Sequence, residues 1–417
     1  MVKSFYQRQR LLSRFKTGEK PGLKNKVIKD IRRIARRLPK TEKIYQVIIL
    51  GAGSGGLMAG RYLKDALILD KKAKIGRPVR SGEGISCQAL ERMGIKPRRA
   101  WISASINIVQ RIAPNGKLFG RLQKNLGYII DKTAFEKFLA LQCRAKIRLR
   151  TEVVDLEQKN NLWVVKTKNN KIFKSKYLIG ADGVHSIVRR KIFKEPLDFL
   201  PAIQYLVKLE KKINTSVAKI YLDSEKFPKG YAWIFPKSKT TANIGLGGEG
   251  NRFHEKFKEF LEEVVKKEYG RTKILENRSG IISYGGACSA IFKDNALLVG
   301  DAAGLADPIF LGGINQAMWS GKIAAECILK DEVDLYEAKI KSLPFADYRL
   351  MKAREIFYSI DDQVLNELGE VLEGHGTSYL KTLPGLWRFV SKPHLRKNFL
   401  SLFRFFSIWR KNRDYLW

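Results

Sequence analysis

The fold is decided by the stretch Ile44-Tyr45-Gln46-Val47-Ile48-Ile49-Leu50-Gly51-Ala52-Gly53-Ser54-Gly55-Gly56. Its first seven residues form a short, mostly apolar run, typical of a parallel strand buried on both faces. The glycines that follow open a helix expected over residues 57–63. Glycine here permits a tight turn, close approach of a pyrophosphate and close packing of helix on strand, while the helix N-terminus offers free N–H groups. The stretch therefore predicts a nucleotide-binding turn.

A carboxylate stands where such a turn needs one. Asp70 ends the next expected strand, 19 residues after Gly51. This spacing suits a carboxylate that accepts hydrogen bonds from ribose hydroxyls. The alternative interpretation is an ordinary strand–helix turn with a surface Asp70.

Two more apolar runs end in turns that contain glycine. Asp182 and Gly183 follow the run at 177–179, and Asp301 follows the run at 296–299, with Gly313 further along the chain. The carboxyl ends of parallel strands meet at one edge of a sheet, where α/β proteins bind ligands. Each turn alone could be structural, but the ordered set predicts a long cofactor that runs across several strands.

The chain has 417 residues, enough for two or three domains, and its 44% hydrophobic content supports a large core. Residues 1–43 are expected to form a basic extension, helical around 26–38. Residues 44–192 and 286–330 are expected to build the cofactor-binding domain in two parts. Residues 193–285 read as an inserted antiparallel-sheet domain, and residues 331–417 as a helical region with a basic-aromatic tail.

The net charge of +38 is the oddest property of the chain. Residues 1–46 carry a net +12 and residues 381–417 a net +8, so the two ends are densest in charge. Such a balance favours an anionic partner, either nucleic acid or a membrane surface. No apolar run is long enough for a signal peptide or a membrane span, and the four cysteines are scattered. We therefore expect a cytoplasmic protein without a metal site.

The ordered motifs GxGxxG, ADGxxS and GDAAGxxxP…GG resemble flavoprotein reductases and monooxygenases of the para-hydroxybenzoate hydroxylase type. The segment 76–86, GRPVRSGEGIS, is similar to the GRPVxCGEG stretch of geranylgeranyl reductases, with Ser81 where many relatives have cysteine. Residues 131–136 resemble that family's DRxxFD element, with Lys132 where relatives commonly have arginine. The resemblance covers roughly residues 44–330.

A third segment gives the most specific match to this family. Residues 231–236, YAWIFP, followed after eight residues by Gly245-Leu246-Gly247, match the family's YxWxFP-x7–8-GxG substrate motif. In a strand Tyr231, Trp233 and Phe235 would share one face and form an aromatic wall suited to a hydrocarbon chain. The alternative interpretation is the core face of an ordinary strand. The resemblance implies substrate contacts at Tyr231, Trp233, Phe235, Pro236, Gly245 and Gly247.

The resemblance implies a Rossmann-like α/β domain that binds FAD, with an inserted antiparallel-sheet substrate domain and a C-terminal helical region. Asp70 would hold the adenosine ribose, Asp301 the ribityl chain, and the backbone at Gly313 and Ile314 would face the flavin. The implied cofactor-binding residues are Gly51, Gly53, Ser54, Gly55, Gly56, Asp70, Arg80, Ser81, Gly82, Gly84, Lys132, Asp182, Gly183, Asp301, Gly313 and Ile314. No residue stands out as a proton donor.

The implied activity is reduction of carbon–carbon double bonds in the isoprenoid chain of a prenyl lipid or prenyl diphosphate, with electrons from NAD(P)H or a ferredoxin-like protein. A related FAD monooxygenase of an aromatic or polyene substrate is the alternative. Nucleic-acid binding on the same fold is a third and less favoured hypothesis. The tail at 386–409 combines aromatic and basic residues, so it either lies on anionic lipid at the inner face of the membrane or docks on the protein's own core.

Overall fold

The computed structural model describes residues 43–120, 124–250, 252–375 and 377–412. Residues from Ile44 onward form one compact unit. The basic extension, including the helix expected at 26–38, lies outside the described residues apart from Lys43.

The first sheet holds the three strands that the glycine turns follow. Its main path runs β18-β19-β11-β1-β2-β8, and β9 and β10 extend it from β11. The pairs β19–β11, β11–β1, β1–β2 and β2–β8 are parallel. The strands are β1 (Ile44–Leu50), β2 (Ala66–Leu69), β8 (Lys146–Arg148), β9 (Val153–Lys159), β10 (Leu162–Thr167), β11 (Ile172–Gly180), β18 (Phe292–Lys293) and β19 (Ala296–Leu298).

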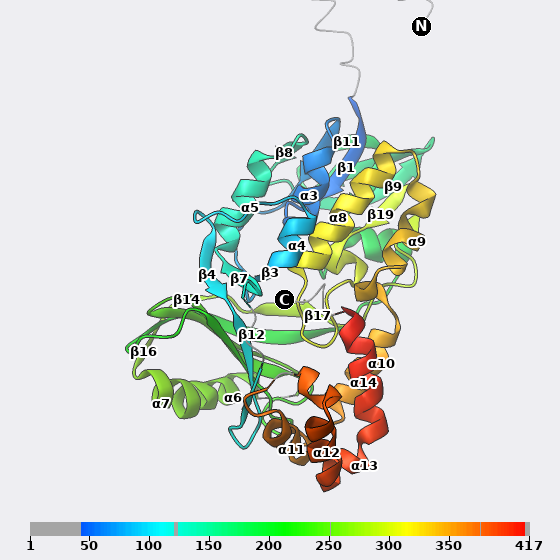
Figure 1. Cartoon of the computed structure of the whole chain (residues 1–417). Coiled ribbons are helices and arrows are strands. Elements are labelled where there is room, and N and C mark those ends of the chain that lie inside the picture. Colours follow the sequence, from blue (N-terminus) through cyan, green and yellow to red (C-terminus); the bar gives the residue numbers. More distant parts are fainter. Residues whose placement is uncertain (1–42, 121–123, 251, 376, 413–417) are drawn as a thin grey trace, which may run out of the picture. The chain divides into compact units, whose positions relative to one another are not determined.

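The helices α3 (Ser54–Tyr62) and α8 (Ile314–Leu329) lie side by side on this sheet (Figure 1). Their apolar residues Leu57, Met58 and Met318 join the strands in a core that is almost wholly sealed from solvent. The α/β class and the parallel order of the three turn-bearing strands, predicted from the sequence, are confirmed. The helix after the first turn begins at Ser54, three residues earlier than expected.

The second sheet follows the path β16-β12-β15-β14-β13-β5-β6, with β17 beside β12. It is antiparallel except for the parallel pair of β13 and β5. Two strands, β5 and β6, come from residues 108–119, ahead of the expected insertion at 193–285. The strands are β5 (Ile108–Ile112), β6 (Leu118–Phe119), β12 (Phe199–Leu209), β13 (Val217–Tyr221), β14 (Tyr231–Ser238), β15 (Thr241–Gly247), β16 (Thr272–Asn277) and β17 (Gly280–Ser283).

Smaller elements join and cover the two sheets. A third sheet, β3-β7-β4, connects them, and its strands are β3 (Gly84–Ser86), β4 (Ile102–Ile106) and β7 (Gly127–Ile130). The covering helices are α4 (Cys87–Arg92), α5 (Lys132–Leu141), α6 (Phe253–Phe260) and α7 (Lys266–Tyr269). The C-terminal helices are α9 (Tyr336–Lys341), α10 (Arg349–Tyr358), α11 (Asp362–Leu372), α12 (Leu383–Ser391), α13 (Pro393–Lys397) and α14 (Phe399–Asn412). In the ranges described, no helix combines the length and apolar character needed to cross a membrane.

Candidate active site

The first glycine turn is fixed by a backbone contact that leaves no room for a side chain at Gly51. Gly51 has φ +105°, and a Cβ there would lie 2.2 Å from the carbonyl oxygen of Ala181 in the second turn. The helix α3 begins at Ser54 with Gly53 as its N-cap, and no side chain caps it. Its first N–H groups therefore remain available to an anion at the cavity wall, and the predicted binding of a cofactor there stays a prediction.

A second helix presents its N-terminus to the same cavity. The helix α8 starts after Gly313, has no side-chain cap and has no acidic residue in its first turn. It approaches α3 closely, because a Cβ at Gly321 would lie 2.2 Å from the carbonyl oxygen of Gly55. Gly53, Gly313 and Ile314 all line the cavity. Two positive helix ends thus meet at one site.

Two of the predicted carboxylates hold the turns in place. The Asp70 carboxylate accepts the N–H of Ala52 at 2.6 Å and the N–H of Lys72 at 2.7 Å. Asp182 accepts the N–H of Ile187 at 2.7 Å through Oδ2, while its buried Oδ1 has no partner among the residues that the structure describes. Burial raises the pKa of Asp182. A carboxylate has about four acceptor positions, so Asp70 keeps capacity for a ribose hydroxyl.

Asp301 and Lys132 lie on the cavity wall. Burial raises the pKa of Asp301, and the charge of Lys132 counteracts part of that rise. The Lys132 ammonium bonds Glu136 Oε1 at 2.6 Å, and Ser54 donates to the same oxygen at 3.1 Å. Burial alone would lower the pKa of Lys132, but Glu136, Glu83 and Asp301 together raise it. The lysine therefore stays cationic beside the cavity.

Glu83 is a site residue that the sequence did not single out. Its side chain is 1% exposed, and Oε2 accepts from Lys237 at 2.7 Å, Asn243 at 2.8 Å and Arg278 at 2.7 Å. Oε1 accepts the N–H of Lys132 at 2.7 Å. Glu83 also has a left-handed φ of +68°, which a non-glycine residue holds only when its surroundings fix it.

A second chain of hydrogen bonds ties the loop at 80–84 to the aromatic strand. Gln204 donates to the carbonyl oxygen of Ser81 at 2.8 Å and accepts from the Trp233 indole at 2.9 Å. The Phe235 ring also meets this loop, because a Cβ at Gly82 would lie 3.0 Å from it. The loop and the aromatic strand are therefore positioned as one unit.

Tyr231, Trp233 and Phe235 form the expected row on β14. Their ring centroids are 5.7 Å and 6.3 Å apart along the row, and all three rings line the cavity. The Tyr231 hydroxyl donates to the carbonyl oxygen of Phe310 at 2.5 Å. Gly245 on the neighbouring strand makes room for the Trp233 ring, since a Cβ there would lie 2.3 Å from Cζ2.

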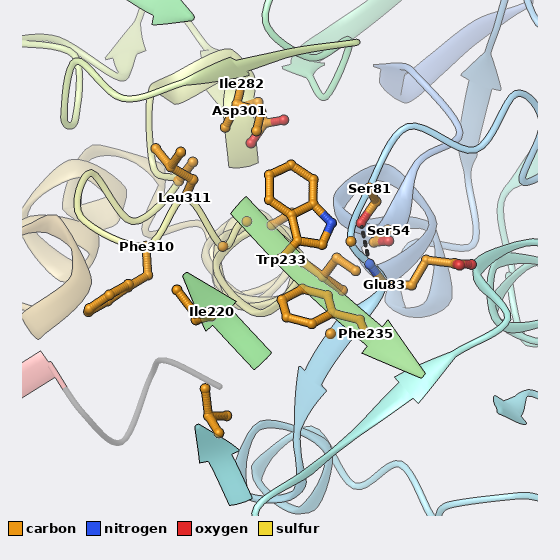
Figure 2. Close-up of a pocket in the computed structure, with 18 of the residues that line it drawn as sticks. Ser54, Ser81, Glu83, Ile220, Trp233, Phe235, Ile282, Asp301, Phe310 and Leu311 are labelled. Atoms are coloured by element: carbon orange, nitrogen blue, oxygen red, sulfur yellow. Dashed lines mark hydrogen bonds between the residues drawn. The ribbon is translucent and has the colours of Figure 1, made fainter. Parts of the chain in front are cut away.

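One cavity of about 420 Å³ brings most of these groups together. Figure 2 shows the Trp233 ring standing in it, with Ser54 and Ser81 on one side and Phe310 on the other. The predicted site residues that line it are Gly53, Ser54, Gly55, Arg80, Ser81, Gly82, Gly84, Lys132, Gly183, Tyr231, Trp233, Phe235, Asp301, Gly313 and Ile314. The predicted residues that lie behind this lining are Gly51, Gly56, Asp70, Asp182, Pro236, Gly245 and Gly247.

The geometry fits a long dinucleotide cofactor. Two helix N-termini without side-chain caps suit the negative charge of such a cofactor. Gly183 and Gly312 border open space, because a Cβ at either position would have no described atom within 4 Å. Just outside the lining, Asp182 and Glu136 each keep a buried carboxylate oxygen without a hydrogen-bond partner among the described residues. The aromatic row continues the same cavity with an apolar surface, so a hydrocarbon chain could lie against the cofactor.

Comparison with known proteins agrees with this geometry. Residues 198–282 match the family model described as the geranylgeranyl reductase catalytic domain. A digeranylgeranylglycerophospholipid reductase of Methanocaldococcus jannaschii is 30% identical over 86% of this chain and 98% of its own length. Digeranylgeranylglycerophospholipid reductase 3 of Methanosphaera stadtmanae is 31% identical over the same shares.

A solved structure supports the same assignment. The geranylgeranyl bacteriochlorophyll reductase-like protein of Thermoplasma acidophilum superposes with a TM-score of 0.73 at 25% identity, over 86% of this chain and all of that one. The chain therefore belongs to the geranylgeranyl reductase family.

Proposed function

We propose that this protein is an FAD-dependent reductase that saturates carbon–carbon double bonds in the isoprenoid chains of prenyl lipids. The observation that carries the proposal is the row of Tyr231, Trp233 and Phe235 in the same cavity as the two helix N-termini. Such a row binds a long apolar chain without polar partners. The names of the archaeal relatives point to the same substrate class.

The chain's own residues would bind and orient both molecules. The N-termini of α3 and α8 would hold the pyrophosphate and the flavin ring, Asp70 the ribose and Asp301 the ribityl chain. Reduced FAD supplies the hydride when it is bound. Trp233 and Phe235 would place the double bond and exclude water, and orientation of this kind contributes much of the rate of a two-molecule reaction.

The test starts from the purified protein. We expect a yellow protein that is reduced under anaerobic conditions and then converts geranylgeranyl lipids to products heavier by two hydrogens per double bond, as measured by mass spectrometry. NAD(P)H and a reduced ferredoxin are supplied in separate reactions, because both are candidate electron donors. Oxygen-dependent hydroxylation without saturation would instead establish a monooxygenase.

We also propose that the protein works at the surface of an anionic membrane, through α12 and the first half of α14. Leu383, Leu386, Trp387 and Val390 share one face of α12, and the first and third of them are 84% and 71% exposed. The exposed large apolar residues of α14 are Leu400 and Phe403, at 79% and 65%. Exposed apolar groups of this size mark a surface that binds something.

Charge favours lipid as the partner of this face. The apolar residues are flanked by exposed basic side chains, which are Arg388, Arg396, Lys397 and Arg404. The opposite face of α14 is packed inside, where Phe405 is 3% exposed and stacks on Phe357 at 5.2 Å. The tail thus docks on the core through one face, and the proposed lipid contact uses the other.

The membrane test compares two variants in co-sedimentation with vesicles that contain anionic lipid. Replacing Trp387 and Phe403 together by glutamate should release the protein from the vesicles, because carboxylates would face anionic lipid. Leu141→Glu is the control, since Leu141 is 87% exposed at the end of α5. Equal release by both variants, or by neither, would remove this face from the proposal.

A further inference from the structure

Arg111 lies in β5 at the part of the cavity that the proposed cofactor site does not use. Its guanidinium carbon is 5.5 Å from the ring centroid of Phe310 and 5.9 Å from that of Trp409 on α14. Arg111 and Trp409 both line the cavity. Figure 2 shows Phe310 and Ser81 on opposite sides of the Trp233 ring. Because Arg111 lies against Phe310, we assign it to the side away from Ser81.

This cation has no carboxylate partner among the residues that the structure describes. Within the described ranges, its side chain makes one hydrogen bond, from Nη1 to the carbonyl oxygen of Val109 at 3.5 Å, which is long. Burial lowers the pKa of Arg111 to about 10, and no acidic group counteracts that shift. The guanidinium is still charged at neutral pH. Arg111 is partly withdrawn from water at the cavity wall, and a cation in such a place is stabilised by an anionic partner.

Further donors surround Arg111. The Trp409 indole nitrogen is buried and has no acceptor within the described part of the chain. Buried indole N–H groups usually bond an acceptor. Thr377 shares a lining with Arg111 and Trp409, Ser378 follows it along the chain and also lines the cavity, and both carry hydroxyl groups. The cluster therefore offers a charged fork, an indole donor and two hydroxyls, and no negative charge.

We propose that Arg111 and Trp409 bind a phosphate group of the substrate, at the end of the cavity away from the glycine turns. The inference rests on the proposed function, because it assigns the polar end of the prenyl substrate. Arginine suits phosphate because its planar fork makes two parallel hydrogen bonds to such an anion. With the phosphate held there, the chain lies along Tyr231, Trp233 and Phe235 toward the helix N-termini.

The experiment measures KM and kcat of the FAD-loaded enzyme for three substrates. These are a geranylgeranylated glycerophospholipid, geranylgeranyl diphosphate and the uncharged alcohol geranylgeraniol. Arg111→Gln should raise KM for the phosphorylated substrates roughly 10- to 100-fold, the loss expected for a hydrogen bond to a charged group. KM for the alcohol and kcat for all three should stay unchanged. An effect on one phosphorylated substrate alone would identify the lipid phosphate or the free diphosphate as the group bound.

Two further variants separate charge from shape. Arg111→Lys keeps the charge without the fork and should have an intermediate KM, while Trp409→Phe keeps the ring without the N–H and should raise KM less. Lys168→Gln is the control for lost positive charge, because Lys168 is an exposed residue in a turn. An equal rise in KM for the alcohol, or no rise for any substrate, would overturn the proposal.

Calorimetric binding of geranylgeranyl diphosphate distinguishes this proposal from the proposed function. If the wild type binds the diphosphate through Arg111 but reduces none of the substrates, the reductase function is wrong and the phosphate site stands. If wild type and Arg111→Gln bind it equally, the phosphate site is wrong. Arg111→Met should leave Tm unchanged or raise it, whereas a merely structural arginine would lower Tm when removed.

Discussion

Gly245 and Gly247 contact the same indole ring from one strand, but only one of them needs to be glycine. A Cβ at Gly245 would lie 2.3 Å from Trp233 Cζ2, whereas a Cβ at Gly247 would lie 3.6 Å from Cζ3. The first distance forces the ring to move, and the second is an ordinary contact. Gly245 is therefore required for the position of the Trp233 ring, while the substrate contacts predicted for Gly245 and Gly247 stay predictions.

The pair gives a matched test of the aromatic row. Gly245→Ala should displace the Trp233 ring and lower kcat/KM for a prenyl lipid roughly tenfold or more, since overpacking costs about 1–3 kcal/mol. Gly247→Ala should leave kcat/KM within about twofold. Flavin content, read from the absorption spectrum, should stay the same in both. Similar losses in the two variants would argue against the role given to Trp233.

Glu83 gives a second prediction at this scale. Glu83→Gln leaves Lys237 and Arg278 without their shared carboxylate, and breaking a buried ion pair in this way costs about 3–5 kcal/mol. Urea unfolding should show that loss in the free energy of unfolding. Glu373→Gln is the control, because Glu373 pairs with Lys117 at the surface, where side-chain exposure is 50% and 44%. The control should change stability by less than about 1 kcal/mol.

The sequence could predict some site residues and not others for a physical reason. Gly51, Asp70 and the 231–235 row are readable because neighbouring positions along one strand or turn define their geometry. The partners of Glu83 stand 154, 160 and 195 residues away, so only the folded chain brings them together. The sequence feature that could have pointed to Glu83 is its position as a charged residue between Gly82 and Gly84. Asp70 was predicted as a ribose ligand, and that role stays a prediction.

At the scale of elements, α3 and α8 depend on each other. The carbonyl oxygen of Gly55 is so close to α8 that a Cβ at Gly321 would lie 2.2 Å from it. This contact sets where both helix N-termini point. The order of the turns was predictable from the sequence, because each turn follows an apolar strand. The contact between the helices was not, because Gly321 lies in a helix without any turn signal.

Gly321→Ala should push the two helices apart and weaken FAD binding. We expect the dissociation constant of FAD to rise roughly tenfold or more. The added methyl group overpacks the contact between the helices at a cost of about 1–3 kcal/mol, and this contact adjoins the cofactor site. Flavin fluorescence titration of the apoprotein measures it. Lys322→Ala, on the same helix, is the control and should bind FAD as the wild type does. Unchanged binding by Gly321→Ala would show that the helix ends tolerate separation.

The whole molecule carries a charge of +38, and its proposed lipid-binding face is both basic and apolar. The electrostatic and hydrophobic contributions to lipid binding respond differently to salt. Salt screens charges over about 8–10 Å at physiological ionic strength, but it does not weaken the burial of apolar groups. Binding to anionic vesicles should therefore decline with salt without disappearing, as judged by co-sedimentation from 0.05 to about 1 M NaCl. Complete loss would mean that charge alone holds the protein there. Competition by RNA together with a colourless protein would favour the nucleic-acid hypothesis.

The close contact of α3 and α8 also affects the amount of folded protein in a cell. It sets two positive helix ends side by side, and like partial charges repel. An anionic cofactor that binds only the folded chain offsets this repulsion and shifts the folding equilibrium by mass action. Unfolded chains are removed by proteases. The number of copies in a cell should therefore follow the supply of flavin, so that a shortage of cofactor lowers the amount of enzyme as well as its activity.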